Sequence, residues 1–96
     1  MAADYGDVPS VWVFNGPRSQ FPSGVFSALS SAESWIALNG LSGTLTRYPI
    51  DVGVYDWAVR LGHFKPRRDD QSDAAFIERF SSASQEHYHF ENGRRG

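Results

Sequence analysis

Pro49 limits what the middle of this chain can form, because proline donates no backbone hydrogen bond and therefore ends or borders a β-strand. Residues 43–48, just before it, alternate in polarity and include two threonines, which predicts a strand. Asp51 follows as a candidate helix N-cap, and Gly62 is a candidate stop. Between them, apolar residues recur with the spacing of one helical face: Val54, Trp57, Ala58 and Leu61. The rest of the chain is expected to be organised around this corner of strand, turn and short aromatic helix.

Two shorter strands are predicted before this corner. Residues 11–14 are β-branched and aromatic, as in a strand covered on both faces. Residues 15–22 begin with Asn-Gly-Pro, which is strong turn chemistry, and form a loop. Residues 23–26 then form a second strand, which we expect to pair with the first.

A helix is predicted next, and the sequence offers two starts for it. Ser27 can act as the N-cap, or Ser30 and Glu33 can form a capping box. Leu29 lies on the apolar face of the helix, which favours the earlier start with Ser27 as the cap. Asn39 and the glycine after it predict a left-handed helix end.

After the corner, residues 65–73 form a charged loop in which three basic residues are offset by three acidic ones. Asp73 or Ser72 is expected to cap a third short helix, which ends at a break over residues 81–84. Residues 85–91 alternate in polarity and predict a last strand, followed by a flexible tail over residues 92–96.

The predicted order ββαβααβ indicates an α+β fold with an antiparallel or mixed sheet of about four strands and two to three short helices. A chain of 96 residues is expected to form a single domain over residues 1–96, with residues 1–9 flexible. Val11 and Val13 share one face of the first strand, and Trp12 and Phe14 share the other. If the helices cover one face only, the other needs cover from residues 63–80 or from a partner.

The composition excludes several functional classes. The chain has no cysteine, so it has no disulfide, thiolate nucleophile or thiolate metal site. Its net charge of -2 does not favour nucleic acid or anionic membranes. Residues 1–4 lack the basic and apolar regions expected of a signal peptide, and no apolar run nears the length of a membrane span. We therefore expect a cytoplasmic protein without cofactor, nucleic-acid partner or membrane partner.

Longer stretches of the sequence resemble an uncharacterised family of small bacterial single-domain proteins. The resemblance is carried by FPSGVFS (21–27), the AxxWI helix (32–36), LSGTLTRYPID (41–51), GVYDWA (53–58), GHF (62–64) and FSSASQEHYHFENG (80–93). It spans nearly the whole chain and implies a compact module without assigned catalytic residues. The shorter run GVFS, with Ala32 and Trp35, is also similar to the hybrid-binding domain of some ribonucleases H, although the basic residues of that domain are missing here.

Aromatic residues make up 15% of the chain, an excess that suits either a small core or a binding face. Tyr48, Tyr55, Asp56 and Trp57 can line an aromatic pocket with one carboxylate, while helical spacing equally suits core packing. Adding the strand aromatics gives the candidate binding residues Trp12, Phe14, Tyr48, Tyr55, Asp56 and Trp57.

Two histidines are the sharpest polar feature. In a strand, His87 and His89 share a face with Glu91, and two histidines at this spacing can bind one metal ion, with His63 as a conceivable third ligand. The alternative is a solvent-exposed edge strand without metal. The bases of residues 65–68 and 94–95 offer a weaker nucleic-acid site, and the sequence contains no nucleophile elbow, phosphate-binding glycine loop or HExxH motif.

Our first hypothesis is a non-enzymatic protein-interaction module, acting as a monomer or homodimer in an immunity- or adaptor-like role. The motive is the aromatic excess, since tryptophan and tyrosine are frequent at interaction hot spots. The alternative is a small metal-dependent protein or enzyme that uses His87, His89 and Glu91.

Overall fold

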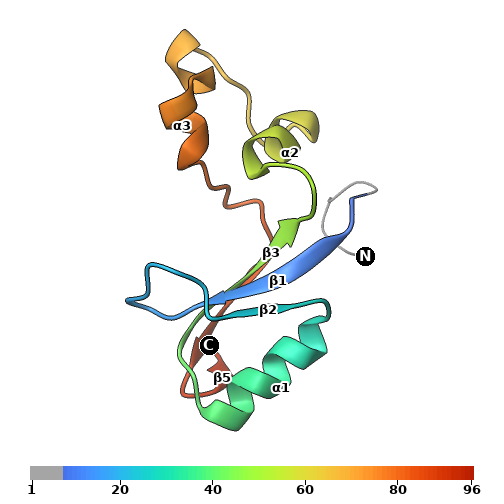
Figure 1. Cartoon of the computed structure of the whole chain (residues 1–96), viewed down its shortest axis with the longest axis vertical. Coiled ribbons are helices and arrows are strands. Elements are labelled where there is room, and N and C mark those ends of the chain that lie inside the picture. The colour runs from blue at the N-terminus through green and yellow to red at the C-terminus, as the bar shows by residue number, and fades with distance from the viewer. Residues whose placement is uncertain (1–7) are drawn as a thin grey trace. The chain divides into compact units, whose positions relative to one another are not determined.

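A computed structural model describes residues 8–96 (Figure 1). In chain order, the elements are β1 (Ser10–Asn15), β2 (Gly24–Phe26), α1 (Leu29–Asn39), β3 (Gly43–Pro49), α2 (Val54–Arg60), the 3-10 helix η1 (Asp69–Ser72), α3 (Ala74–Glu78), β4 (His87–Glu91) and β5 (Arg94–Arg95). The α+β prediction is confirmed, with five strands instead of about four. Of the N-terminal residues that we expected to be flexible, 1–7 lie outside the described part of the chain.

The chain forms two compact units. The sheet unit contains Ser10–Tyr48 and Glu86–Gly96. The helical unit contains Pro49–Gln85 together with Val8 and Pro9, and the Pro9 carbonyl accepts a hydrogen bond from the Ile50 amide at 2.8 Å. Over residues 8–96, no helix combines the length and apolar character that a membrane span requires.

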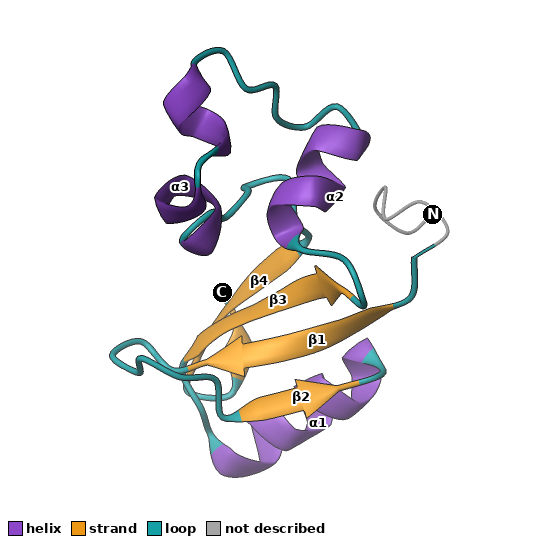
Figure 2. Ribbon diagram, turned by 45° about the horizontal axis from the view of Figure 1, so that its top comes forward, coloured by secondary structure: helices purple, strands orange, loops and turns teal. Residues whose placement is uncertain are grey.

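The sheet has the strand order β2-β1-β3-β4-β5 (Figure 2). β1 and β2 pair in antiparallel fashion, as the sequence predicts, and β3 pairs with β4 and β4 with β5 in the same sense. β5 lies in the tail that we expected to be flexible. Asn92 and Gly93 allow this last hairpin, because both have positive φ angles of 52° and 86° and Asn-Gly is the preferred pair for such a two-residue turn.

Helix α1 packs on one face of the sheet (Figure 2) and closes the core of the sheet unit. The buried residues are Trp12, Phe14, Ala32, Ile36, Leu45 and Phe90. Trp12 and Phe14 therefore occupy the helix-covered face of β1. The opposite face carries Val25, Thr44 and His89 among others, in the register Val13 with Val25 and Thr44 with His89.

Two predicted helix caps are wrong. Helix α1 has Ala28 as its N-cap, with no side-chain cap. Phe26 is the last residue of β2 and packs against Trp35, with 5.3 Å between the ring centroids. Ser27 therefore belongs to the connection between β2 and α1, and the helix starts one residue later than predicted. The capping box of Ser30 and Glu33 does not form either, because both residues lie inside the helix.

The cap of α2 is Gly53 and not Asp51. Asp51 adopts a left-handed conformation with φ of 66°, in the turn that follows Pro49 two residues before the cap. By contrast, the cap of α3 is confirmed, since the Asp73 side chain accepts a hydrogen bond from the Phe76 amide at 3.0 Å. The charged loop over residues 65–73 contains η1.

Candidate functional site

The structure divides the predicted binding residues between the two units. Trp12 and Phe14 are 6% and 2% exposed in the core of the sheet unit. Trp57 is 1% exposed in the core of the helical unit, and Tyr55 is also buried. Most of these rings therefore serve core packing, the alternative interpretation of their spacing.

The two remaining candidates differ from the buried rings. Asp56 is exposed on α2 in the helical unit, and Tyr48 is half-buried at the end of the sheet unit. Within neither unit do the predicted residues assemble into a single exposed aromatic face. The aromatic site around Tyr48, Tyr55, Asp56 and Trp57 thus remains a prediction.

The helical unit holds an aromatic cluster around Tyr55 that the sequence analysis did not assemble. Tyr55 lies 6.0, 6.2 and 5.3 Å from Phe64, Phe76 and Phe80, measured between ring centroids. Its hydroxyl donates to the Gln71 carbonyl at 2.8 Å, which ties η1 to α2. The i,i+4 spacing of Phe76 and Phe80 was a visible signal, whereas Phe64 comes from a segment without periodicity.

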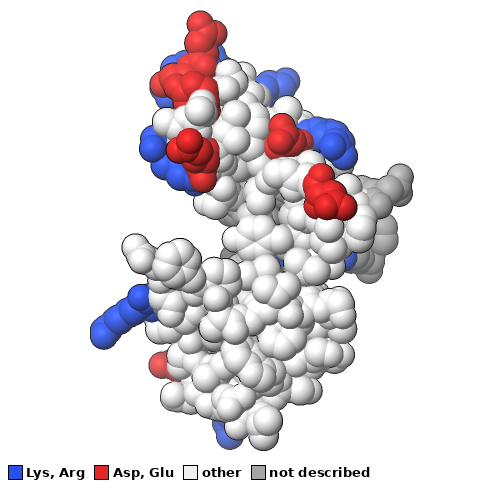
Figure 3. Space-filling model, in the orientation of Figure 1, with Lys and Arg blue, Asp and Glu red and all other residues white. Residues whose placement is uncertain are grey.

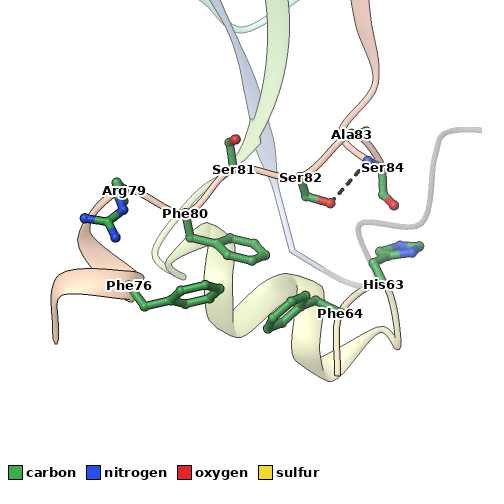
Figure 4. Close-up of a pocket in the computed structure, with 9 residues that line it drawn as sticks. All are labelled: His63, Phe64, Phe76, Arg79, Phe80, Ser81, Ser82, Ala83 and Ser84. Carbon is green, nitrogen blue, oxygen red and sulfur yellow. Dashed lines mark hydrogen bonds between the residues drawn. The ribbon is translucent and has the colours of Figure 1, made fainter. Parts of the chain in front are cut away.

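A pocket of about 520 Å³ opens beside this cluster (Figure 4). Its lining residues are His63, Phe64, Phe76, Arg79, Phe80, Ser81, Ser82, Ala83 and Ser84. Figure 4 shows the three phenyl rings in a row, with His63 at one end and Arg79 at the other. The serine-rich segment, predicted only as a break, therefore forms part of a pocket wall.

The histidine pair lies on the sheet face opposite α1. The rings of His87 and His89 are 5.6 Å apart, and His89 Nδ1 lies 3.4 Å from the Thr44 hydroxyl. His89 and Glu91 line a second pocket of about 400 Å³. Within residues 8–96, no three histidine, aspartate or glutamate side chains are grouped so that they could hold a metal ion. His63 belongs to the other unit.

A chain of polar contacts runs along the helix-covered face of the sheet. Arg47 donates to Ser10 at 2.7 Å and to Glu86 at 3.1 Å, and its guanidinium carbon lies 5.8 Å from the centre of the Trp12 ring. Glu86 also accepts a hydrogen bond from the Tyr88 hydroxyl. Arg95 lies 3.9 Å above the Tyr88 ring. These contacts connect β1, β3, β4 and β5.

These contacts make the free energy of unfolding depend on pH in the alkaline range. The hydrogen bond to Glu86, with a smaller effect of partial burial, raises the pKa of Tyr88 above its ordinary value. Folding therefore favours the protonated phenol, and its contribution is complete below the unfolded pKa and is lost as the pH rises through the folded pKa. We expect Tyr88→Phe to show a smaller loss of stability than the unmodified protein as the pH rises above about 10, the usual pKa of tyrosine, measured by urea unfolding. Equal losses in both proteins would contradict this assignment.

The comparisons with known proteins gave one match. The family model DUF7710, a domain of unknown function, matches residues 11–96. Neither the search of curated proteins nor that of solved structures gave a match.

Proposed function

We propose that this chain, which belongs to the family DUF7710, a domain of unknown function, is a non-enzymatic protein-interaction module that pairs with a second copy of itself along β2. The observation that carries the proposal is the exposure of large apolar side chains at this end of the sheet. Phe21 and Val25 are 74% and 64% exposed. Among residues 8–96, β2 is the terminal strand of the sheet, so in this part of the chain one side of it has no neighbouring strand.

The two ends of the sheet differ in charge. β5 consists of two arginines, and charged residues on an edge strand oppose pairing with other chains. The segment around β2, residues 19–32, contains no charged residue. Figure 3 shows that charged side chains gather over the helical unit and are few on the visible face of the sheet unit.

An uncharged edge suits a second copy as the partner. Two identical charged edges would repel each other, whereas β2 can approach itself without a Coulombic penalty. Two-fold dimers, in which the same patch meets on both copies, are the commonest homo-oligomers. Antiparallel pairing of β2 would extend the sheet and bring the exposed Val25 side chains of both copies together.

Cross-linking tests this arrangement, because the chain contains no cysteine and one introduced thiol is unique. We expect Val25→Cys to form a covalent dimer under mild oxidation, since the two Cβ atoms would lie within about 4–6 Å. Leu38→Cys is the matched control, because Leu38 is 84% exposed but lies on α1. The unsubstituted protein should sediment as a dimer, and Val25→Lys should sediment as a monomer. A monomeric mass at millimolar concentration, or equal cross-linking of both cysteine variants, would refute the pairing.

An immunity- or adaptor-like role in the bacterial cytoplasm is the cellular setting that we propose for such a module. The small size and the α+β class of the chain support it. A toxin gene next to the gene of this chain would argue for the immunity role, and its consistent absence among family members would argue against it.

Metal binding is a second candidate function, favoured by the 5.6 Å separation of the His87 and His89 rings. Two histidines fall short of the three or four ligands of zinc sites, and Glu91, which is not grouped with them among residues 8–96, would have to move to contribute a carboxylate. Zinc at micromolar concentration should then shift the NMR signals of His87 and His89 but not that of His63. Unchanged signals would end this candidate.

A further inference from the structure

We propose that the pocket of the helical unit, defined above by its nine lining residues, binds a small aromatic carboxylate. This site is independent of the pairing proposed for β2, which involves residues of the sheet unit only. Three properties of the pocket support such a ligand: its aromatic wall, the sign of its charge and its size.

The wall of the pocket is built from rings that stay partly accessible. Phe64, Phe76 and Phe80 are each half-buried, and Phe64 lies 5.6 Å from Phe76 and 5.0 Å from Phe80. Tyr55 supports them from the core side with its own ring contacts. Aromatic faces and edges at these spacings accept a further ring in stacked or edge-to-face geometry. A ligand with an aromatic ring would therefore complete the cluster.

The charge of the pocket favours an anion. Among residues 8–96, Arg79 is the lining residue with a permanent charge, and no aspartate or glutamate of this range lines the pocket. Ser81, Ser82 and Ser84 add hydroxyl groups, and the Ser82 hydroxyl already accepts a hydrogen bond from the Ser84 amide at 3.1 Å. Figure 4 places Arg79 at one end of the row of rings. A guanidinium group binds a carboxylate through two parallel hydrogen bonds, so the acidic group of the ligand would lie at this end.

The size of the pocket favours a small molecule over a protein segment. Its volume of about 520 Å³ lies within the range of ligand pockets, which is about 300–1,000 Å³. A phenyl ring with a short acidic chain would pack on the aromatic wall with its acidic group at the Arg79 end of the row of rings. Hydrophobic walls with a few polar groups that fix orientation are the usual composition of such sites.

The probe is 3-phenylpropionate, and its neutral amide, 3-phenylpropanamide, is the matched control ligand. We expect the carboxylate to shift the NMR signals of the Phe64, Phe76 and Phe80 rings and to bind about tenfold more tightly than the amide, as one charge-assisted interaction allows. Arg79→Gln should remove this preference. Arg60→Gln is the matched control variant, because Arg60 is an exposed arginine of the same unit that does not line the pocket.

Three outcomes would overturn the proposal. They are no shift of the ring signals at millimolar carboxylate, equal affinity for acid and amide, and an unchanged preference in Arg79→Gln. Arg79 is exposed, so the variant is expected to fold, and its NMR spectrum without ligand verifies this directly. The β2 cross-link of Val25→Cys should be the same with and without the carboxylate, so failure of one proposal is distinguishable from failure of the other.

Discussion

Replacing Trp57 with alanine is expected to destabilise the protein by about 3–5 kcal/mol, the range for removing a buried tryptophan or phenylalanine. Trp57 is 1% exposed and, with Ala58, forms the buried centre of the helical unit. Apolar side chains from several segments pack against this centre: Val52, Val54, Leu61, Phe64 and Phe80. The truncated side chain would leave a cavity among residues that are joined by short loops and cannot all move to fill it.

Urea unfolding followed by far-UV circular dichroism measures this loss. Leu38→Ala is the matched control, because Leu38 is 84% exposed and lies on α1, away from the β2 edge, and we expect its effect on unfolding to stay within about 0.5 kcal/mol. A similar small effect for Trp57→Ala would contradict a core role for Trp57. It would restore the original hypothesis that this ring belongs to a binding face.

Gly43→Ala is expected to destabilise the protein by about 2–4 kcal/mol, through strain and a direct clash. Gly43 has a φ angle of 152°, which side chains rarely adopt, and a Cβ atom there would lie 2.2 Å from the Asn15 carbonyl oxygen. The same Cβ would lie 2.8 Å from the edge of the buried Phe14 ring. Because backbone and core atoms both block the position, the start of β3 would have to move away from the end of β1.

The matched control for this substitution is Gly40→Ala. Gly40 also has a positive φ angle, 61°, but a Cβ atom there would meet nothing within 4 Å. We expect a cost of about 1–2 kcal/mol from the left-handed conformation alone. Thermal or urea unfolding of both variants separates the cost of the positive φ angle from the cost of the clash of the added Cβ atom. Equal losses of stability at the two positions would show that the clash with Asn15 does not contribute to the cost.

The burial of the aromatic residues changes the basis of the interaction hypothesis. From the sequence, we expected surplus rings such as Trp12 and Trp57 to bind a partner. Each of them lies instead in the core of a different unit, where it contributes to stability. The proposal now depends on the uncharged edge at β2 and on Phe21, a ring that the sequence analysis placed in a loop and did not single out.

Local patterns in the sequence predicted most individual elements. The alternation before Pro49, the apolar spacing from Val54 to Leu61 and the Asp73 cap are properties of neighbouring residues, and each of these elements is present. The misplaced caps show the limit of such patterns. Ser27 and Asp51 have the chemistry of caps, but packing of Phe26 on Trp35 and the turn after Pro49 fixed where the helices begin.

The sequence by itself determined the α+β class, the pairing of the first two strands and the two faces of β1, because periodicity depends only on neighbouring residues. Only the tertiary structure decided which rings share a core, since Tyr55, Phe64 and Phe80 meet through long-range packing that no spacing encodes. It also decided that Arg79 and the serines after it line a pocket. Burial is a property of the whole packed unit, so the sequence alone does not determine which of its many aromatic residues are buried and which are exposed.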